Sequence, residues 1–586
     1  MTRQRTSKTH VLSVLLLFVV IFTILAALAA VAQLNPVPRT PTKPYIAFAP
    51  SNAGIVGDRA VVSNTSLFLP VVTYDSGGFE ASSIAVADVN GDEKPDLVVA
   101  NCGGCYGPPS ITHGGSVGVM LGNGDGTFQP AVTYASGGQT PLFVVVADVN
   151  GDGKPDLLVA NRCGNNGCLN DSLVSVLLGN GDGTFHAAVT YDTAGLFPTS
   201  VAVGDVNGDG KPDLLVANRC ADSNCDGSVA VLLGNGDGTF QAGVTYRTGG
   251  SEAFSVAVAD VNGDAKPDLL VGTDDIVCHD RSCSPVGAVA VFLGNGDGTF
   301  QPAVPYDTGG DSPVSLAVAD VNGDGKLDLA VANQACCSSA NGVVGVLVGN
   351  GDGTFKTVVT YKAGVGGWGT SVGVADVNDD GKPDLVVTDQ CAGANCLNDG
   401  IVGILLGNGN GTFQQAVTFN TGGFLTNSVA VTDVNGDGKP DLLVANQCAD
   451  DAGTCARASV GVLLNNGGPL DTTPPVIALS STPKILWPPN GRMVPVTISG
   501  TITDTGSGVK VNSATYAVKD EYGQVQPKGT LILGPGGTYS VTFLLQASRQ
   551  VTDRDGRQYT ISVRATDNVG NAGSKAGVVT VPLQLF

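Results

Sequence analysis

The stretch Asp148–Asn161, DVNGDGKPDLLVAN, decides the fold of this 586-residue chain because it recurs seven times. Its relatives begin at Asp88, Asp205, Asp260, Asp320, Asp376 and Asp433, at intervals of 55 to 60 residues. A second stretch of the type LGNGDGTF lies between them and ends at Phe128, Phe185, Phe240, Phe300, Phe355 and Phe413. A fixed period of this length indicates a repeat architecture.

Each repeat predicts four β-strands. They are a segment of the type SVAVADV, an apolar PDLLVAN run, an SVLLGN segment and an AVTY segment after the Phe. The NGDG turn before the fourth strand is typical of a hairpin. A sheet with two apolar faces needs neighbours on both sides, so we predict an all-β, seven-bladed β-propeller of four-stranded blades. A β-solenoid would have much shorter repeats.

The two ends of the array predict how it closes. A lone fourth-type strand, FLPVVTY (Phe68–Tyr74), precedes the first repeat, and the last repeat stops at its third strand, GVLLNN (Gly461–Asn466). We therefore expect the N-terminal strand to complete the last blade, which removes exposed sheet edges.

Composition excludes several classes of protein. The chain is 42% hydrophobic and only 14% charged, which argues against bulk disorder. Its formal net charge of -22 disfavours binding to nucleic acid or to an anionic membrane surface. An acidic excess is either a solvated surface or a set of carboxylates that hold cations.

The N-terminus predicts export. Arg3, Arg5 and Lys8 precede an apolar run that starts at Val11, and Ala30-Val31-Ala32 resembles a cleavage site. Residues 1–32 are therefore a signal peptide or an uncleaved anchor, since the run is long enough to span a bilayer. Residues 33–66 are a Pro-rich linker, and the rest of the chain is expected to be secreted or on the cell surface.

The acidic residues of each repeat follow the pattern D-x-N-x-D-x-K-x-D. Calcium takes six to eight oxygen ligands from a tightly curled loop, and alternate residues of such a loop can point inward together. We predict up to seven Ca²⁺ sites, with side chains at positions 1, 3, 5 and 9 and the backbone carbonyl of the position-7 lysine as ligands. The patterned positions of each loop carry three carboxylates and one lysine, so one Ca²⁺ neutralises their charge. The alternative is an Asp/Asn-Gly hairpin without metal. The seven sets are Asp88, Asn90, Asp92, Lys94, Asp96; Asp148, Asn150, Asp152, Lys154, Asp156; Asp205, Asn207, Asp209, Lys211, Asp213; Asp260, Asn262, Asp264, Lys266, Asp268; Asp320, Asn322, Asp324, Lys326, Asp328; Asp376, Asn378, Asp380, Lys382, Asp384; and Asp433, Asn435, Asp437, Lys439, Asp441.

Three of these loops depart from the pattern. Glu93 and Ala265 replace glycine at position 6, and Asp379 replaces glycine at position 4. We expect strained turns and weaker sites there. No loop has the Glu that closes an EF-hand at position 12, and strands rather than helices flank the loops.

The repeat resembles the FG-GAP/VCBS repeat and is similar to the N-terminal propeller of integrin α-chains. The likeness rests on DVNGDGKPDLLVA followed by LLGNGDGTF and covers residues 68 to about 466. It implies a seven-bladed propeller with calcium in the hairpins between the first and second strands. The family includes adhesion proteins, lectins and some sugar-degrading enzymes, so the resemblance implies no single activity.

The 14 cysteines fall as one pair per repeat, between the second and third strands. An exported chain with this even count predicts local disulfides, with zinc as the alternative. The adjacent Cys336 and Cys337 form a strained ring or pair elsewhere. We hypothesise that these cysteine loops form the binding face, although disulfides that only toughen the fold are the alternative. The other pairs are Cys102/Cys105, Cys163/Cys168, Cys220/Cys225, Cys278/Cys283, Cys391/Cys396 and Cys448/Cys455.

The repeats stop after Gly468. We place the propeller at residues 67–468, a linker at 469–473, and a separate domain at 474–586 with alternating segments such as VPVTISGTI and TYSVTFLLQ. Its length fits an immunoglobulin-like or fibronectin-like β-sandwich. Its ending, YTISVRATDNVGNAGS, resembles bacterial surface Ig-like modules.

These observations predict a monomeric, non-catalytic, calcium-binding adhesion or recognition module for a protein or glycan. A polysaccharide lyase or hydrolase with a loop-built site is one alternative, and a structural surface protein is another. The sequence contains no G-x-S-x-G, H-E-x-x-H or phosphate-binding motif. We therefore predict no catalytic residues.

Overall fold

The computed structural model describes residues 67–103, 114–164, 172–222, 225–279, 282–334, 343–364, 369–390, 400–449, 457–468, 473–504, 508–510, 512–524, 526–567 and 571–583. Within these ranges the fold is all β, apart from the 3₁₀ turn η2 (Pro535–Gly537). No helix in the described ranges is long and apolar enough to span a membrane. The predicted signal or anchor and the linker, residues 1–66, lie outside them.

The repeats form four-stranded antiparallel sheets, as the sequence predicts. The first sheet contains β2 (Ala81–Ala87), β3 (Asp96–Asn101), β4 (Ser116–Met120) and β5 (Val132–Ala135). The second contains β6 (Gln139–Ala147), β7 (Asp156–Cys163), β8 (Leu173–Leu177) and β9 (Val189–Asp192). The third contains β10 (Leu196–Gly204), β11 (Asp213–Cys220), β12 (Ser228–Leu232) and β13 (Val244–Arg247).

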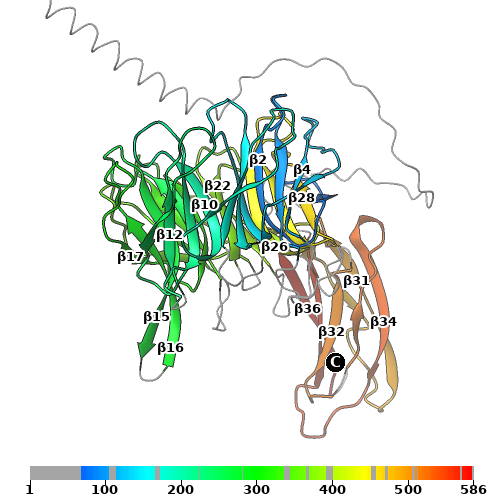
Figure 1. The fold of residues 1–586 in the computed structure, drawn as a ribbon. Helices are drawn as coiled ribbons and strands as arrows, with labels where there is room; N and C mark the ends of the chain where they lie inside the picture. The colour runs from blue at the N-terminus through cyan, green and yellow to red at the C-terminus, as the bar shows by residue number, and fades with distance from the viewer. Residues whose placement is uncertain are drawn as a thin grey trace, which may run out of the picture. The chain divides into compact units, whose positions relative to one another are not determined.

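The fourth sheet contains β14 (Glu252–Ala259), β15 (Asp268–His279), β16 (Ser282–Phe292) and β17 (Val304–Asp307). The fifth contains β18 (Pro313–Ala319), β19 (Asp328–Asn333), β20 (Val343–Leu347) and β21 (Val359–Lys362). The sixth contains β22 (Gly369–Ala375), β23 (Asp384–Asp389), β24 (Ile401–Leu405) and β25 (Val417–Asn420). The β15–β16 hairpin is longer than its counterparts and projects from its sheet (Figure 1).

The seventh sheet joins both ends of the array. Its own strands are β26 (Phe424–Thr432), β27 (Asp441–Cys448) and β28 (Ser459–Leu463), and β1 (Val72–Asp75) supplies the fourth. The register pairs Val72 with Val462 and Asp75 with Ser459. The predicted pairing of the N-terminal strand with the last repeat is therefore present.

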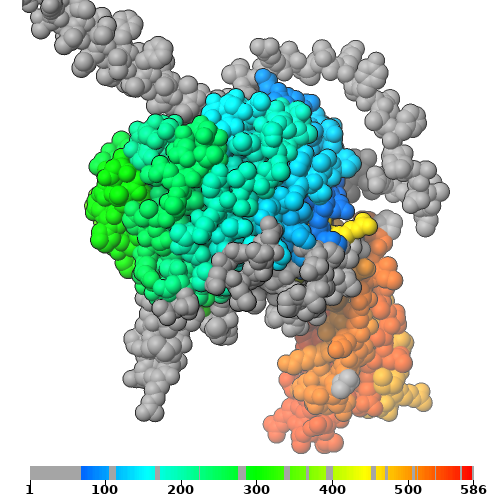
Figure 2. All heavy atoms as spheres, viewed as in Figure 1, coloured from blue at the N-terminus to red at the C-terminus, as the bar shows by residue number. Residues whose placement is uncertain are grey.

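The apolar side chains on both faces of a sheet pack against the two neighbouring sheets. In β11, Leu215 and Ala217 face one neighbouring sheet while Leu214 and Val216 face the other, because side chains alternate along a strand. All four side chains are fully buried. Figure 2 shows the atoms of the first to fourth sheets adjoining along one side, from blue to green.

The first and seventh sheets share such a cluster. Ile84, Leu97 and Val99 of the first sheet pack with Leu443 and Val460 of the seventh. The blue strand β2 accordingly lies beside the yellow β26 (Figure 1). The arrangement is β-propeller-like.

Residues 473–583 form two further sheets. One contains β29 (Val476–Ile477), β30 (Ser480–Thr482), β31 (Met493–Thr503) and β34 (Thr538–Gln546). The other contains β32 (Thr515–Asp520), β33 (Lys528–Thr530), β35 (Arg557–Thr566) and β36 (Ala572–Val581). Ile498 and Phe543 of the first share a core with Ile561 and Val579 of the second. The immunoglobulin-like assignment remains a prediction.

Candidate metal-binding loops

The predicted calcium loops connect the first and second strands of each sheet. In the second sheet the loop runs from Asp148, directly after β6, to Asp156, the first residue of β7. Gly151 and Gly153 have positive φ angles of 75° and 79°, which glycine adopts without steric cost. This lets the backbone curl so that its amides face the first aspartate.

The aspartate at position 1 organises the curl. Oδ1 of Asp148 accepts a hydrogen bond from the backbone N–H of Gly151 at 2.7 Å, and Oδ2 accepts one from Gly153 at 2.8 Å. The side chains at positions 3 and 5 each accept one backbone hydrogen bond in the same way. Asn150 accepts from the N–H of Asp152 at 2.8 Å, and Asp152 accepts from that of Lys154 at 2.9 Å. The side chains of positions 1, 3 and 5 thus hold one compact turn.

The aspartate at position 9 is fully buried. Asp156 accepts hydrogen bonds from the N–H of Val149 at 3.0 Å and from that of Gly179 at 2.8 Å. Burial raises the pKa of Asp156, and the nearby carboxylates of Asp148 and Asp152 raise it further. It therefore links its own loop to the end of the third strand.

The same position in the last two loops is perturbed most. Burial raises the pKa of Asp384 and of Asp441 to about 6, against the opposing effect of two backbone hydrogen bonds each. A cation beside these carboxylates would favour their ionised form.

The lysine at position 7 neutralises part of the loop. Nζ of Lys154 lies 3.8 Å from Oδ2 of Asp152, and the equivalent pair is present in six of the seven loops at 3.2–4.0 Å. Both partners are exposed, so each pair contributes little to stability. The lysine stem packs on Gly181, where a Cβ would lie 3.0 Å from its Cδ.

The donor set suits calcium chemically. Three carboxylates, one amide oxygen and one backbone carbonyl are the hard oxygen ligands that calcium prefers. The three carboxylates of a loop do not, however, lie within 4.8 Å of one another. Among the described residues, only Glu521, Asp553 and Asp555 meet that distance. The loop side chains in this structure instead serve the backbone hydrogen bonds and the lysine pairs described above.

The three residues that replace glycine in the loop pattern adopt the positive φ that glycine has at these positions in the other loops. Glu93, Ala265 and Asp379 have φ angles of 63°, 63° and 59°. Non-glycine residues are strained in this region, as the sequence predicts for these turns. Weaker metal binding at these loops remains a prediction.

Four of the acidic loops accept a backbone hydrogen bond from the turn between the third and fourth strands of the next sheet. The N–H of Gly183 donates to the carbonyl of Val89 at 3.0 Å, and the N–H of Gly126 donates to that of Val434 at 3.2 Å. Five of these turns carry a further aspartate. One of them is Asp182, whose pKa is lowered by hydrogen bonds from Thr184. From the sequence we predicted only hairpins at the NGDG turns. Their recurrence along the chain is the signal that could have pointed to this contact with the next sheet.

The cysteine loops lie largely outside the described residues. Cys220 and Cys225 form a disulfide, as predicted. Cys102, Cys163 and Cys448 are also disulfide-bonded, and the cysteines that we predict as their partners are not described. Cys278 and Cys283 stand opposite each other in the β15–β16 register. The pairing of Cys336 and Cys337 falls outside the described residues.

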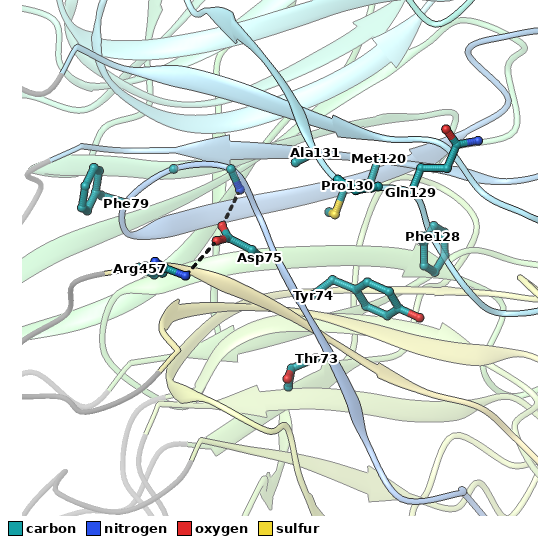
Figure 3. Close-up of a pocket in the computed structure, with 12 residues that line it drawn as sticks. Thr73, Tyr74, Asp75, Phe79, Met120, Phe128, Gln129, Pro130, Ala131 and Arg457 are labelled. Atoms are coloured by element: carbon teal, nitrogen blue, oxygen red, sulfur yellow. Dashed lines mark hydrogen bonds and ion pairs between the residues drawn. The ribbon is translucent and has the colours of Figure 1, made fainter. Parts of the chain in front are cut away.

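A cavity lies at the seam between the first and seventh sheets. It has a volume of about 700 Å³ and is lined by β1, by the segment from Phe128 to Ala131 and by Arg457 (Figure 3). Asp75 pairs with Arg457 at 3.8 Å, and Tyr74 meets Phe128 edge to face at 5.5 Å between ring centres. Similar edge-to-face pairs, such as Tyr134 with Phe185, join other adjacent sheets. We therefore interpret this cavity as part of the seam.

The chain belongs to the FG-GAP-like repeat family. The family model matches residues 105–159, 164–216, 219–271, 272–331, 335–387 and 392–444, which is more than half of the chain. These six matches cover the region from the first to the seventh sheet.

Two further proteins show more limited similarity. Phosphatidylinositol-glycan-specific phospholipase D of Bos taurus is 30% identical over 147 residues, or 22% of this chain. The chain spans only 18% of the length of that relative. The crystal structure of the V. cholerae biofilm matrix protein Bap1 is 13% identical, covers 70% of this chain and 90% of that chain, and has a TM-score of 0.36. At that TM-score the likeness is too low to assign a function.

Proposed function

We propose that this chain is an exported, calcium-binding, seven-bladed β-propeller that acts as a non-catalytic recognition module for a protein or glycan. The observation that carries the proposal is the sevenfold repetition of the acidic loop on sheets that differ in their cysteine loops. A rigid, repeated scaffold with variable loops is an arrangement that commonly serves binding.

Closure of the ring is supported by contacts between its ends. Nδ2 of Asn427 in the seventh sheet donates to the carbonyl of Ala81 in the first at 2.8 Å. The β1–β28 pairing and the shared apolar cluster join the same two sheets. In addition, one cavity of about 150 Å³ is lined by residues from the first strands of all seven sheets. A central axis surrounded by seven blades accounts for all of these contacts.

Calcium binding is supported by the composition of the loops. In the third loop, Asp205, Asn207, Asp209 and Asp213 would hold the ion together with the carbonyl of Lys211. A bound ion would supply a charge that offsets three neighbouring carboxylates. To bind the ion, Asp209 would have to give up its ion pair with Lys211, in which Oδ2 and Nζ lie 3.7 Å apart. Because that pair is exposed and weak, this exchange costs little.

Export is supported by the disulfides. Cys220–Cys225 and the other bonded cysteines fit an oxidising compartment, where such bonds persist.

The metal claim is tested by thermal unfolding with and without EDTA, together with the stoichiometry of bound calcium. One site at 100 times its Kd contributes about 2.7 kcal/mol, so several sites should raise Tm clearly. Asp205→Asn with Asp209→Asn should remove one ion per chain. The control Asp237→Asn, in a turn that we do not predict to bind metal, should leave the stoichiometry unchanged. An unchanged melting curve in EDTA would contradict calcium binding.

The recognition claim is tested by screening the mature chain against glycans and extracellular matrix proteins with and without chelator. We expect at least one partner whose binding weakens in EDTA. The absence of any partner in both conditions would favour a purely structural role.

A further inference from the structure

The dipeptide Asn-Gly occurs at two different places in the repeats. It occupies positions 3 and 4 of six acidic loops, and it opens each of the six turns between a third and a fourth strand. Asn-Gly is prone to deamidation, because glycine has no side chain to hinder attack by its backbone nitrogen on the asparagine. The loop asparagines are Asn90, Asn150, Asn207, Asn262, Asn322 and Asn435, and the turn asparagines are Asn123, Asn180, Asn235, Asn295, Asn350 and Asn408.

The glycine of this dipeptide has the same backbone conformation in both settings. Its φ lies between 73° and 77° in the six loops and between 75° and 82° in the six turns. The local sequence is also shared, because Asp-Gly follows Asn-Gly in four of the loops and in five of the turns. Any difference in reactivity therefore arises from the hydrogen bonds and the exposure of the reacting groups.

In the acidic loops both reacting groups are held. The N–H of Gly151 donates to Oδ1 of Asp148 at 2.7 Å. Oδ1 of the half-buried Asn150 accepts from the N–H of Asp152 at 2.8 Å. All six loops have both hydrogen bonds, the first at 2.7–2.8 Å and the second at 2.8–2.9 Å. Both bonds must break before the glycine nitrogen can reach Cγ of the asparagine.

In the turns the attacking nitrogen is not held. The N–H of Gly181 donates no hydrogen bond to a described residue, and the same is true of the equivalent glycine in the other five turns. Asn180 is exposed, and its side chain makes one hydrogen bond within the described residues, from Nδ2 to Oγ1 of Thr184 at 2.9 Å. The other turns have the same bond at 2.8–2.9 Å. Water can replace such an exposed bond at little cost.

We propose that the six turn asparagines are sites of spontaneous deamidation, whereas the fold protects the six loop asparagines. The backbone nitrogen of the glycine attacks Cγ of the asparagine and closes a succinimide ring. Nδ2 leaves as ammonia and carries away the proton of the glycine N–H. Water then opens the ring at either carbonyl, which gives aspartate or isoaspartate. The net reaction consumes water and releases ammonia, and it requires no oxidant, cofactor or enzyme.

Deamidation changes both the charge and the backbone of a turn. Each event replaces a neutral amide by a carboxylate, and isoaspartate lengthens the main chain by a methylene group. The turn that contains Asn180 reaches the preceding sheet through the N–H of Gly183, which donates to the carbonyl of Val89 at 3.0 Å. We expect isoaspartate at Asn180 to disturb this contact, so that the aged protein melts at a lower temperature.

The test is incubation of the folded mature chain in heavy-oxygen water at mildly alkaline pH, followed by peptide mapping with mass spectrometry. EDTA is present, so that no metal ion holds the loops. Because a loop must first break a hydrogen bond to a carboxylate, we expect the turn asparagines to incorporate heavy oxygen about tenfold faster than the loop asparagines. In the urea-denatured chain, the two sets should react at the same rate.

A pair of variants tests the cause of the protection. Asp148→Ala frees the N–H of Gly151 and should bring Asn150 towards the rate of the turn asparagines. Asn207, in the next loop, should stay protected in this variant, which shows that the rest of the fold is intact. The control Asp237→Ala lies in a turn of another sheet and should leave the rate at Asn150 unchanged.

The proposal is overturned if the loop asparagines of the folded chain react as fast as the turn asparagines. Faster reaction in the loops would show that the aspartate at position 1 acts as a base towards the glycine N–H instead of holding it. The proposal also fails if the turns stay unmodified while the denatured chain reacts. Faster reaction of the turns in urea would overturn it as well, because local sequence rather than the fold would then set the difference.

Discussion

At the scale of single residues, Asp274 illustrates how burial acts on a carboxyl group outside the acidic loops. It follows the buried part of β15 and accepts hydrogen bonds from the N–H and the hydroxyl of Ser312 at 2.7 and 2.9 Å. Burial raises the pKa of Asp274, and the neighbouring carboxylates of Glu252 and Asp311 raise it further, while Ser312 opposes the rise. The net shift is upward.

Asp274→Asn should therefore change the pH dependence of stability. Because the folded-state pKa lies above the unfolded value, the stability that Asp274 contributes is complete below about pH 4 and is lost as pH rises through the folded pKa. The free energy of unfolding of Asp274→Asn, relative to the unmodified chain, should increase between about pH 4 and neutrality. Urea titrations at several pH values measure this difference. Ser312→Ala removes a donor to the carboxylate and should steepen the loss, whereas a constant difference would refute the assignment.

The buried aspartate at position 9 should matter for folding even without metal. In EDTA, Asp213→Ala leaves the N–H groups of Val206 and Gly234 without their acceptor, at a cost of about 3 kcal/mol. Asp209→Ala, in the same loop, loses only an exposed ion pair and an exposed hydrogen bond and should cost about 1 kcal/mol or less. Equal losses in urea denaturation would show that burial at position 9 is unimportant.

At the scale of elements, the glycine that ends each third strand is fixed by a close approach. A Cβ on Gly234 would lie 2.1 Å from the carbonyl oxygen of Pro212, and the equivalent glycines of the other repeats meet the same obstacle at 2.0 or 2.1 Å. The seventh sheet has Asn465 instead, whose N–H donates to Asp441 at 2.6 Å. The turn and the acidic loop of one sheet are thus packed against each other.

Gly234→Ala should consequently cost about 3 kcal/mol, because backbone atoms must move to admit the methyl group. Gly210→Ala serves as the control. It has a φ of 80°, but no atom lies within 4 Å of the position that a methyl group would take, so only the left-handed backbone penalty of about 1 kcal/mol applies. Chemical denaturation of both variants gives the comparison, and a smaller loss for Gly234→Ala than for Gly210→Ala would be inconsistent with this packing.

At the scale of the whole molecule, the seventh sheet is completed by β1, a strand from the N-terminal end of the array. Leu67 and Phe68 are almost completely buried, and the ring of Phe68 meets that of Phe419 edge to face at 5.1 Å. β1 also covers the edge of β28, which would otherwise expose unpaired backbone groups.

A chain that begins at Ser76 should therefore melt at a lower temperature and self-associate, whereas a chain that begins at Leu67 should behave as the mature protein does. A peptide of residues 67–75 added in trans should restore part of the lost Tm. Calorimetry and sedimentation velocity measure both effects. An unchanged Tm for the shorter chain would argue against closure by this strand.

The pairing of the Phe68–Tyr74 segment with the last repeat was predicted from the strands at the two ends of the array, because the last repeat lacks its fourth strand. Local sequence determined the repeat, the four strands of each unit and the turns between them. These features follow from periodicity and turn residues that lie close together in the chain. The same local pattern placed Asp148, Asn150 and Asp152 in one turn. It also located the Cys220–Cys225 disulfide, because its two cysteines are only five positions apart.

Only the tertiary structure decided which side chains meet across sheets. Asp156 reaches Gly179 within its own unit, but Ser82 donates to Pro141 of the next sheet, and Gln390 and Asn427 meet from neighbouring sheets. Alternation along a strand predicts two faces without saying which neighbour each will touch. Contacts of this kind, between residues separated by tens to hundreds of positions, are set by packing rather than by local pattern.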